Sequence, residues 1–222
     1  MRTRPEQSGP VLRHVLRSQV KDVLIERIIE GRYKPGARLV ETQIARELGV
    51  SQAPVREALR DLESVGMIES SAFRGARVSK PTRAELIEAF PVRAALESLA
   101  AAEAAPRITD EQLDQLDELI EQMEDAAKQG KAHQQAIANA QFHALIVEAA
   151  QNSTLERLWA FLEPSARTYL TTARSGVDLT KLAVRHRKIV KPLRERDAKG
   201  AADAMREHLL EAGRWLQEVD DA

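Results

Sequence analysis

Apolar residues recur at helical spacing in three stretches within the first 80 residues. The stretch over 11–30 carries a one-sided stripe of apolar residues at positions 12, 15, 16, 20, 23, 24 and 28. Shorter stripes follow over 41–48 and 51–65, and Gly49 separates them. The pattern therefore predicts three helices, the last two joined by a tight turn in which Ser51 is placed to cap the third.

After the third stripe the chain changes to a pattern of short extended segments. Residues 67–70 and 76–79 are predicted to form two short strands on either side of a turn at 73–75. Three helices with a tight turn before the third, followed by a β-hairpin, are the order of a winged helix-turn-helix. We expect residues 11–80 to form a DNA-binding domain and residues 1–10 to form a disordered tail.

Beyond Pro81 the helical pattern continues to the end of the chain. It predicts six helices, over 82–105, 110–129, 131–151, 154–174, 178–196 and 199–219. Their short connections favour antiparallel neighbours. The predicted fold class is therefore mostly α, with an N-terminal winged helix-turn-helix plus a C-terminal six-helix antiparallel bundle over 81–222.

Composition and charge narrow the possible functions. The chain has no cysteine, which excludes disulfides and thiolate metal sites. No apolar run is long enough for a membrane span and no secretory signal opens the chain, so we expect a cytoplasmic protein. Residues 1–80 carry 15 basic and 10 acidic side chains, whereas the remainder carries 18 and 24. The basic excess at the front favours a polyanionic partner for that part alone.

The third predicted helix has a polar face opposite an apolar face, which is typical of a recognition helix. Gln52, Arg56 and Arg60 recur at intervals of four and so share the face opposite the apolar stripe. Arginine can pair with guanine and glutamine with adenine in the major groove. The alternative is a solvated face whose arginines pair locally, but the preceding turn and the following hairpin favour DNA. Arg38 is expected to contact backbone phosphate, and Arg74 to meet phosphate or a minor groove.

The same stretch resembles a known family of regulators. The segments Gly31-Arg-Tyr-Lys-Pro-Gly-Ala-Arg-Leu-Val-Glu41, Leu48-Gly-Val-Ser51 and Pro54-Val-Arg-Glu-Ala-Leu59 are similar to the GntR family over about residues 15–80. The resemblance implies contact with operator DNA at Arg38, Ser51, Gln52, Pro54, Arg56, Arg60 and Gly75. Gln52 stands where the family often has arginine, which leaves the operator sequence open.

Three histidines of the predicted bundle are candidates for a metal site. His186 and His208 lie at equal distances from the turn near residue 197, so both fall roughly 16 Å from that bend in an antiparallel hairpin. Asn139 and His143 share a face of another helix. Imidazoles and a carbonyl oxygen converging inside a bundle suit zinc, nickel or a similar divalent cation. The alternative is that each histidine is an ordinary core or surface residue.

Residues 82–222 resemble the helical ligand-binding (FCD) domain of the FadR-type branch of that family. Matching stretches include Val92-Arg-Ala-Ala-Leu-Glu97, Phe142-His143, His186-Arg-Lys-Ile189 and Ala204-Met-Arg-Glu-His208, and six helices suggest the VanR-like subgroup. The resemblance implies a metal bound by an aspartate and three histidines and completed by a small carboxylate. His143, His186 and His208 match, whereas Asn139 replaces the aspartate, so we expect weaker or differently selective metal binding.

The resemblance also suggests residues for the effector. Arg93 and Arg167 are candidates to pair with the carboxylate of a small organic acid, with a surface or interhelical salt bridge as the alternative for each. We expect a homodimeric regulator, not an enzyme, that binds a palindromic double-stranded operator.

Two other functions remain open from the residues alone. The first is a DNA-binding dimer that has no ligand. The second is a metalloenzyme built on the bundle, although the chain has neither a Glu-x-x-His nor a His-Glu-x-x-His motif.

Overall fold

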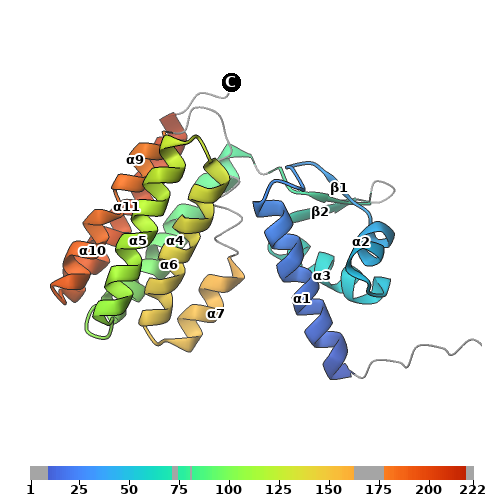
Figure 1. Cartoon of the computed structure of the whole chain (residues 1–222), viewed down its shortest axis with the longest axis horizontal. Helices are drawn as coiled ribbons and strands as arrows, with labels where there is room; N and C mark the ends of the chain where they lie inside the picture. Colours follow the sequence, from blue (N-terminus) through green and yellow to red (C-terminus); the bar gives the residue numbers. More distant parts are fainter. Residues whose placement is uncertain (1–9, 72–74, 81, 163–177, 219–222) are drawn as a thin grey trace, which may run out of the picture. The chain divides into compact units, whose positions relative to one another are not determined.

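The computed structural model divides into two compact units, Met1–Lys80 and Pro81–Ala222 (Figure 1). It describes residues 10–71, 75–80, 82–162 and 178–218. Arg74, Arg167 and residues 1–9 of the expected tail lie outside these ranges.

The first unit is a winged helix-turn-helix, as the sequence predicts. Its helices are α1 (Pro10–Ile29), α2 (Glu41–Leu48) and α3 (Gln52–Ser64), and its strands are β1 (Arg38–Leu39), β2 (Ile68–Ser71) and β3 (Gly75–Val78). The strands form an antiparallel sheet in the order β1-β3-β2. Strand β1 was not expected from the sequence, because two residues are too few to show an alternating pattern.

The apolar stripes of the three helices form the core of this unit. Leu24 and Ile28 of α1 and Val55 and Leu62 of α3 are fully buried, and α1 packs against α3. Burying a side chain of this size stabilises the fold by about 1.5–3 kcal/mol. The turn between α2 and α3 depends on Gly49, which has a φ of 67° and ends α2.

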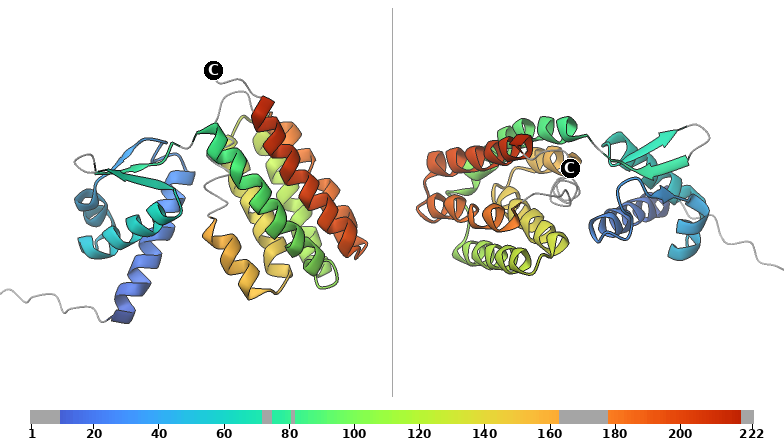
Figure 2. Two further views of the ribbon diagram at one scale, coloured as in Figure 1. Left: turned by 180° about the vertical axis from the view of Figure 1, so that it is seen from behind. Right: turned by 90° about the horizontal axis from the view of Figure 1, so that it is seen from above.

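The second unit is a helical bundle (Figure 2). Its described helices are α4 (Arg83–Ala104), α5 (Asp110–Lys128), α6 (Ala132–Ala149), α7 (Ser153–Phe161), α9 (Leu179–Val184), α10 (Arg187–Arg194) and α11 (Ala198–Glu218). Helix α4 packs along α11, α5 packs along α6, and α10 contacts both α5 and α11. The mostly α fold class is therefore confirmed. Across the described ranges, every helix is too short or too polar to cross a membrane.

The segment 178–196, expected as one helix, forms two. Helix α9 ends at Val184 and α10 begins at Arg187, so Arg185 and His186 lie at the break. The His186 Nδ1–H donates to the carbonyls of Leu182 and Ala183, both at 3.0 Å. In a continuous helix the Leu182 carbonyl would accept the backbone N–H of His186 instead, so this side chain competes with the helix. One helix was expected over 154–174. In the structure α7 ends at Phe161, and residues 163–174 lie outside the described ranges.

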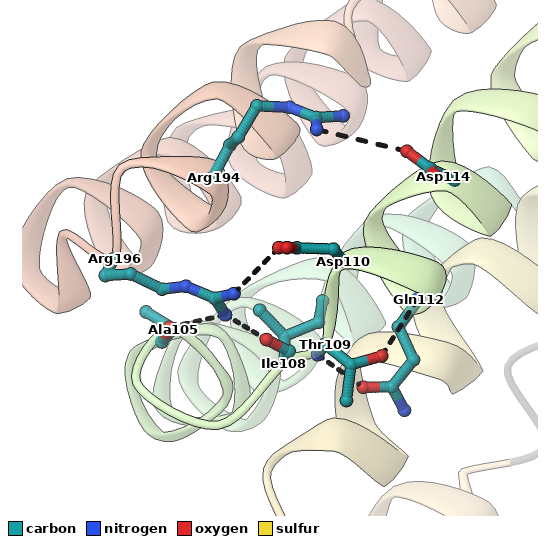
Figure 3. Close-up of polar contacts among 8 residues, drawn as sticks. All are labelled: Ala105, Ile108, Thr109, Asp110, Gln112, Asp114, Arg194 and Arg196. Carbon is teal, nitrogen blue, oxygen red and sulfur yellow. Dashed lines mark hydrogen bonds and ion pairs between the residues drawn. The ribbon is translucent and has the colours of Figure 1, made fainter.

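Polar contacts fasten the α10–α11 turn to the α4–α5 turn (Figure 3). Arg196 has a φ of 56°, and its guanidinium donates to the Ile108 carbonyl and pairs with Asp110 at 3.2 Å. Arg194 pairs with Asp117 at 2.7 Å. These contacts fix one end of the hairpin that carries His186 before α10 and His208 on α11.

Candidate functional site

Helix α3 presents a polar face to solvent. Gln52, Arg56 and Arg60 are exposed, whereas Val55 and Leu59 on the opposite side are buried. This is the division that the sequence predicts, and it leaves the three polar side chains accessible to a groove of DNA.

The Arg56 side chain is oriented by a residue that the sequence analysis missed. Its Nε lies 3.1 Å and its terminal nitrogen 2.9 Å from Oε2 of Glu41, the first residue of α2. The Arg56 side chain remains 53% exposed. Glu41 therefore holds the guanidinium in one orientation without covering it.

The wing sheet places two arginines on one exposed face. Arg38 and Arg77 are direct partners across β1 and β3, so their side chains project to the same side. Gly75 has a φ of 74°, and a Cβ there would lie 3.8 Å from Nε of Arg38. The wing therefore combines Arg38 with Arg77, a residue that sequence reasoning did not single out.

Two other expected DNA contacts differ in accessibility. Ser51 is exposed at the N-cap of α3, as predicted, but its side chain makes no capping hydrogen bond. Pro54 is buried in the first turn of α3. Burial favours a role for Pro54 in starting the helix over a direct contact with DNA.

The three bundle histidines come together from three places in the second unit. His143 lies on α6, His186 at the α9–α10 break and His208 on α11. One ligand nitrogen from each lies within 4.8 Å of the others, and the His186 and His208 ring centroids are 4.3 Å apart. Their exposed fractions are 1%, 1% and 8%. We call this group the histidine triad.

Buried ring nitrogens of the triad lack hydrogen-bond partners. Among the described residues, Nε2 of His186 and Nδ1 of His208 are both buried without a partner. Leaving such an atom unsatisfied costs about 1–3 kcal/mol. Burial, together with the neighbouring His143, lowers the pKa of His186 to about 3, and burial lowers the pKa of His208 well below its usual value. Both rings are therefore neutral near pH 7, which is the form that coordinates metal ions.

A buried ion pair lies beside the triad. Glu97 is fully buried on α4, its Oε1 lies 2.7 Å from Nε of Arg93, and its Oε2 lies 2.5 Å from Nδ1 of His143. Burial alone would raise the pKa of the Glu97 carboxyl, but the interactions with Arg93 and His143 outweigh it and lower that pKa to about 2. Arg93 thus forms a buried salt bridge within α4, which differs from the surface or interhelical salt bridge considered as its alternative role. Its contact with an effector stays a prediction.

A second arginine pair also lies beside the triad. Arg185, at the α9–α10 break, pairs with Glu211 at 2.5 Å and donates to the His208 carbonyl at 2.8 Å. Its guanidinium also lies 4.5 Å from the centre of the Trp215 ring. These contacts hold the break against α11, and neither Arg185 nor Glu97 was identified from the sequence.

Asn139 is buried one helical turn before His143, on the same face of α6. Its position is compatible with the triad, and its neutral amide brings no charge to that region. The two remaining candidates, Arg74 and Arg167, lie outside the described residues.

A winged helix-turn-helix joined to a helical bundle defines a two-domain DNA-binding regulator. The model described as "Bacterial regulatory proteins, gntR family" matches residues 16–78, and that of the FCD domain matches residues 88–211. The chain therefore belongs to the GntR family of bacterial transcriptional regulators and carries an FCD domain, as its FadR-type resemblance implied.

Individual relatives support the same assignment. The chain is 36% identical over 202 residues to a probable D-xylose utilization operon transcriptional repressor of Paenarthrobacter nicotinovorans, covering 91% of this chain and 89% of that protein. It is 30% identical to the transcriptional regulator McbR of Escherichia coli strain K12, covering 88% and 90%. The solved structure of E. coli McbR/YncC aligns with a TM-score of 0.76 at 27% identity, covering 91% and 97%. These relatives are regulators and not enzymes.

Proposed function

We propose that this regulator binds a palindromic operator as a homodimer in the cytoplasm, and that a small organic acid anchored to a divalent metal ion in its FCD domain controls operator affinity. The observation that carries the sensing part is the histidine triad, in which the His186 and His208 rings are neutral and each has a buried ring nitrogen without a partner. The exposed face of α3 supports the operator-binding part.

The triad fits a divalent metal in ligand type and spacing. Nitrogens bound to one tetrahedral zinc ion lie about 3.4 Å apart. The triad nitrogens already lie within 4.8 Å of one another, so small side-chain rotations would bring them to that spacing. Imidazole suits zinc and nickel, and the Asn139 amide oxygen is a candidate fourth ligand.

The surroundings prepare the rings for coordination. Glu97 contacts Nδ1 of His143, and backbone carbonyls accept from Nδ1 of His186. These contacts leave Nε2 of both rings available to the metal, an arrangement common at protein metal sites. When bound, the metal would supply a positive charge that draws in the carboxylate of an organic acid.

The operator-binding part uses α3 and the wing. Gln52, Arg56 and Arg60 would read base edges in the major groove. Ser51, Arg38, Gly75 and Arg74 would meet the sugar-phosphate backbone or the minor groove. In a homodimer the two recognition helices would bind half-sites related by a two-fold axis.

Metal analysis of the purified protein tests the metal-anchored site. We expect the wild-type protein and a His133→Ala control on the same helix to bind zinc, whereas His143→Ala does not. Melting temperatures of all three proteins show that each is folded. Equal zinc content in His143→Ala and the wild type would rule out the metal site.

A further inference from the structure

Arg56 on the exposed face of α3 has a carboxylate partner of its own. Its Nε lies 3.1 Å and one terminal nitrogen lies 2.9 Å from Oε2 of Glu41, and Nε also lies 3.3 Å from Oε1. Arg60, one turn further along the same face, is exposed and has no ion pair within the described part of the chain. Pairing with a carboxylate therefore distinguishes Arg56 from its neighbour on this face.

The contacts with Glu41 leave one edge of the Arg56 guanidinium unused. A guanidinium has five N–H donors in one plane, and Glu41 accepts from the edge formed by Nε and the nearer terminal nitrogen. The edge formed by the two terminal nitrogens keeps a parallel pair of N–H donors. In the major groove, O6 and N7 of guanine accept such a pair. The unused edge therefore has the donors that a guanine contact needs.

The Glu41 carboxylate also changes which groups of DNA Arg56 can bind. It neutralises the guanidinium charge, and it would repel a phosphate that approached the same side chain. A phosphate is attracted by net positive charge, whereas a base edge has no net charge and needs only aligned donors. The pair should therefore contribute little to the binding of random DNA and more to the recognition of a base.

The fold holds Glu41 in place for this contact. Glu41 is the first residue of α2, where the helix dipole favours a negative side chain, and α2 packs against α3. Its side chain is 33% exposed and meets Arg56, fifteen residues further along the chain. Because the guanidinium is already oriented in the DNA-free protein, less conformational entropy is lost when it binds a base.

We propose that Glu41 is a positioning residue that directs Arg56 to a guanine and disfavours contact between Arg56 and phosphate. This inference rests on the proposed operator binding and adds the base that Arg56 recognises and the residue that directs it. Removing the Glu41 charge should lower the preference for operator over random DNA and, at the same time, tighten binding to random DNA.

Affinities for two DNA fragments test these two effects. An operator fragment is first selected from random DNA with the full-length wild-type protein. The affinity of each variant for this fragment and for a scrambled one is then measured by fluorescence anisotropy at one salt concentration. We expect Glu41→Gln to bind the scrambled fragment about twofold more tightly and to lose about tenfold of the preference for the operator.

Glu47→Gln is the matched control. It removes the same charge from the same helix, but its carboxylate pairs with Arg27 of α1. This variant should keep the wild-type preference for the operator. Melting temperatures show whether each variant is folded.

Replacing single guanines of the operator by 7-deazaguanine identifies the base. This analogue lacks the N7 acceptor and leaves the phosphates unchanged. We expect one guanine in each half-site at which the replacement weakens binding of the wild type about fivefold but hardly affects Arg56→Ala or Glu41→Gln. A purely structural role of Glu41 would not couple it to one base in this way.

The outcomes distinguish this inference from the proposed function. A change of affinity in Glu41→Gln that is the same for both fragments overturns the inference, because Glu41 would then have no influence on base recognition. An operator in which no guanine is coupled to Arg56 overturns it as well, and in both cases operator binding stands. A folded wild-type protein that selects no sequence from random DNA overturns the proposed operator binding and this inference together.

Discussion

At the scale of single residues, Glu97 contributes both to the stability of the bundle and to the surroundings of the histidine triad. Its carboxylate is the partner of both Arg93 and His143. Replacing it by glutamine leaves the buried Arg93 charge without a full counter-charge, so we expect Glu97→Gln to lower the free energy of unfolding by about 3 kcal/mol. Urea denaturation followed by circular dichroism measures the change.

A surface pair provides the control for Glu97. Lys128 and Asp125 form an exposed ion pair on α5, so Lys128→Gln should leave the urea midpoint nearly unchanged. A Glu97→Gln protein as stable as the Lys128→Gln protein would show that the buried pair contributes little.

The neutral histidines make the metal-free protein sensitive to acid. The folded-state pKa of His186 is about 3, below its ordinary value of 6.5, so the unfolded chain binds more protons between these values. Stability is therefore fully present above about pH 6.5 and declines as the pH falls toward 3. Melting temperatures of chelator-treated protein should fall across this window, and His186→Gln should flatten the profile. An equally steep profile in the variant would assign the pH dependence to other groups.

Arg56 is the residue whose replacement best tests base recognition. It is exposed on α3 and oriented by Glu41. We expect Arg56→Ala to weaken binding to a selected operator fragment about tenfold or more, with a smaller loss on random DNA. Fluorescence anisotropy on both DNAs measures the difference. Arg32→Ala, which removes another exposed arginine of the same unit, is the control. Equal losses of affinity for the two DNAs would mean that Arg56 contacts phosphate and does not read a base.

At the scale of elements, the N-terminal helices could be predicted closely because local signals mark their ends. Helix α2 has the bounds expected from the sequence, since Gly49 supplies the left-handed residue that ends it. The break between α9 and α10 could not be predicted in this way. At this break the His186 side chain bonds to backbone carbonyls, a contact that no periodic pattern reveals.

The candidate site was predictable in its histidines but not in its surroundings. The mirrored positions of His186 and His208 about the α10–α11 turn indicated that they would meet, and their rings are adjacent. Glu97 did leave a signal: it falls in the buried stripe of α4 between Ala94 and Ala101, where a charged residue needs a partner. Arg185 left no such signal in the sequence, because its partners Glu211 and Trp215 lie on α11, more than 20 residues further along the chain.

At the scale of the whole molecule, the proposed function requires the two units to be coupled. Linkage makes this measurable without knowing the conformational change. If zinc, added in succinate buffer, changes operator affinity by some factor, operator DNA in the same buffer must change zinc affinity by the same factor. We expect that factor to lie between about 5 and 150. Both affinities can be measured on the same full-length protein in succinate buffer.

Two variants show whether such coupling passes between the units. Arg56→Ala should bind zinc as tightly as the wild type. Adding operator DNA should not change that zinc affinity, because the variant does not bind the operator at the concentrations used. His143→Ala should bind the operator with an affinity that zinc and succinate leave unchanged. Zinc affinity of the wild type that is indifferent to saturating operator would mean that the FCD domain binds its metal without controlling the DNA-binding unit. In that case the bundle would serve the regulator in some way other than sensing, even with its metal site intact.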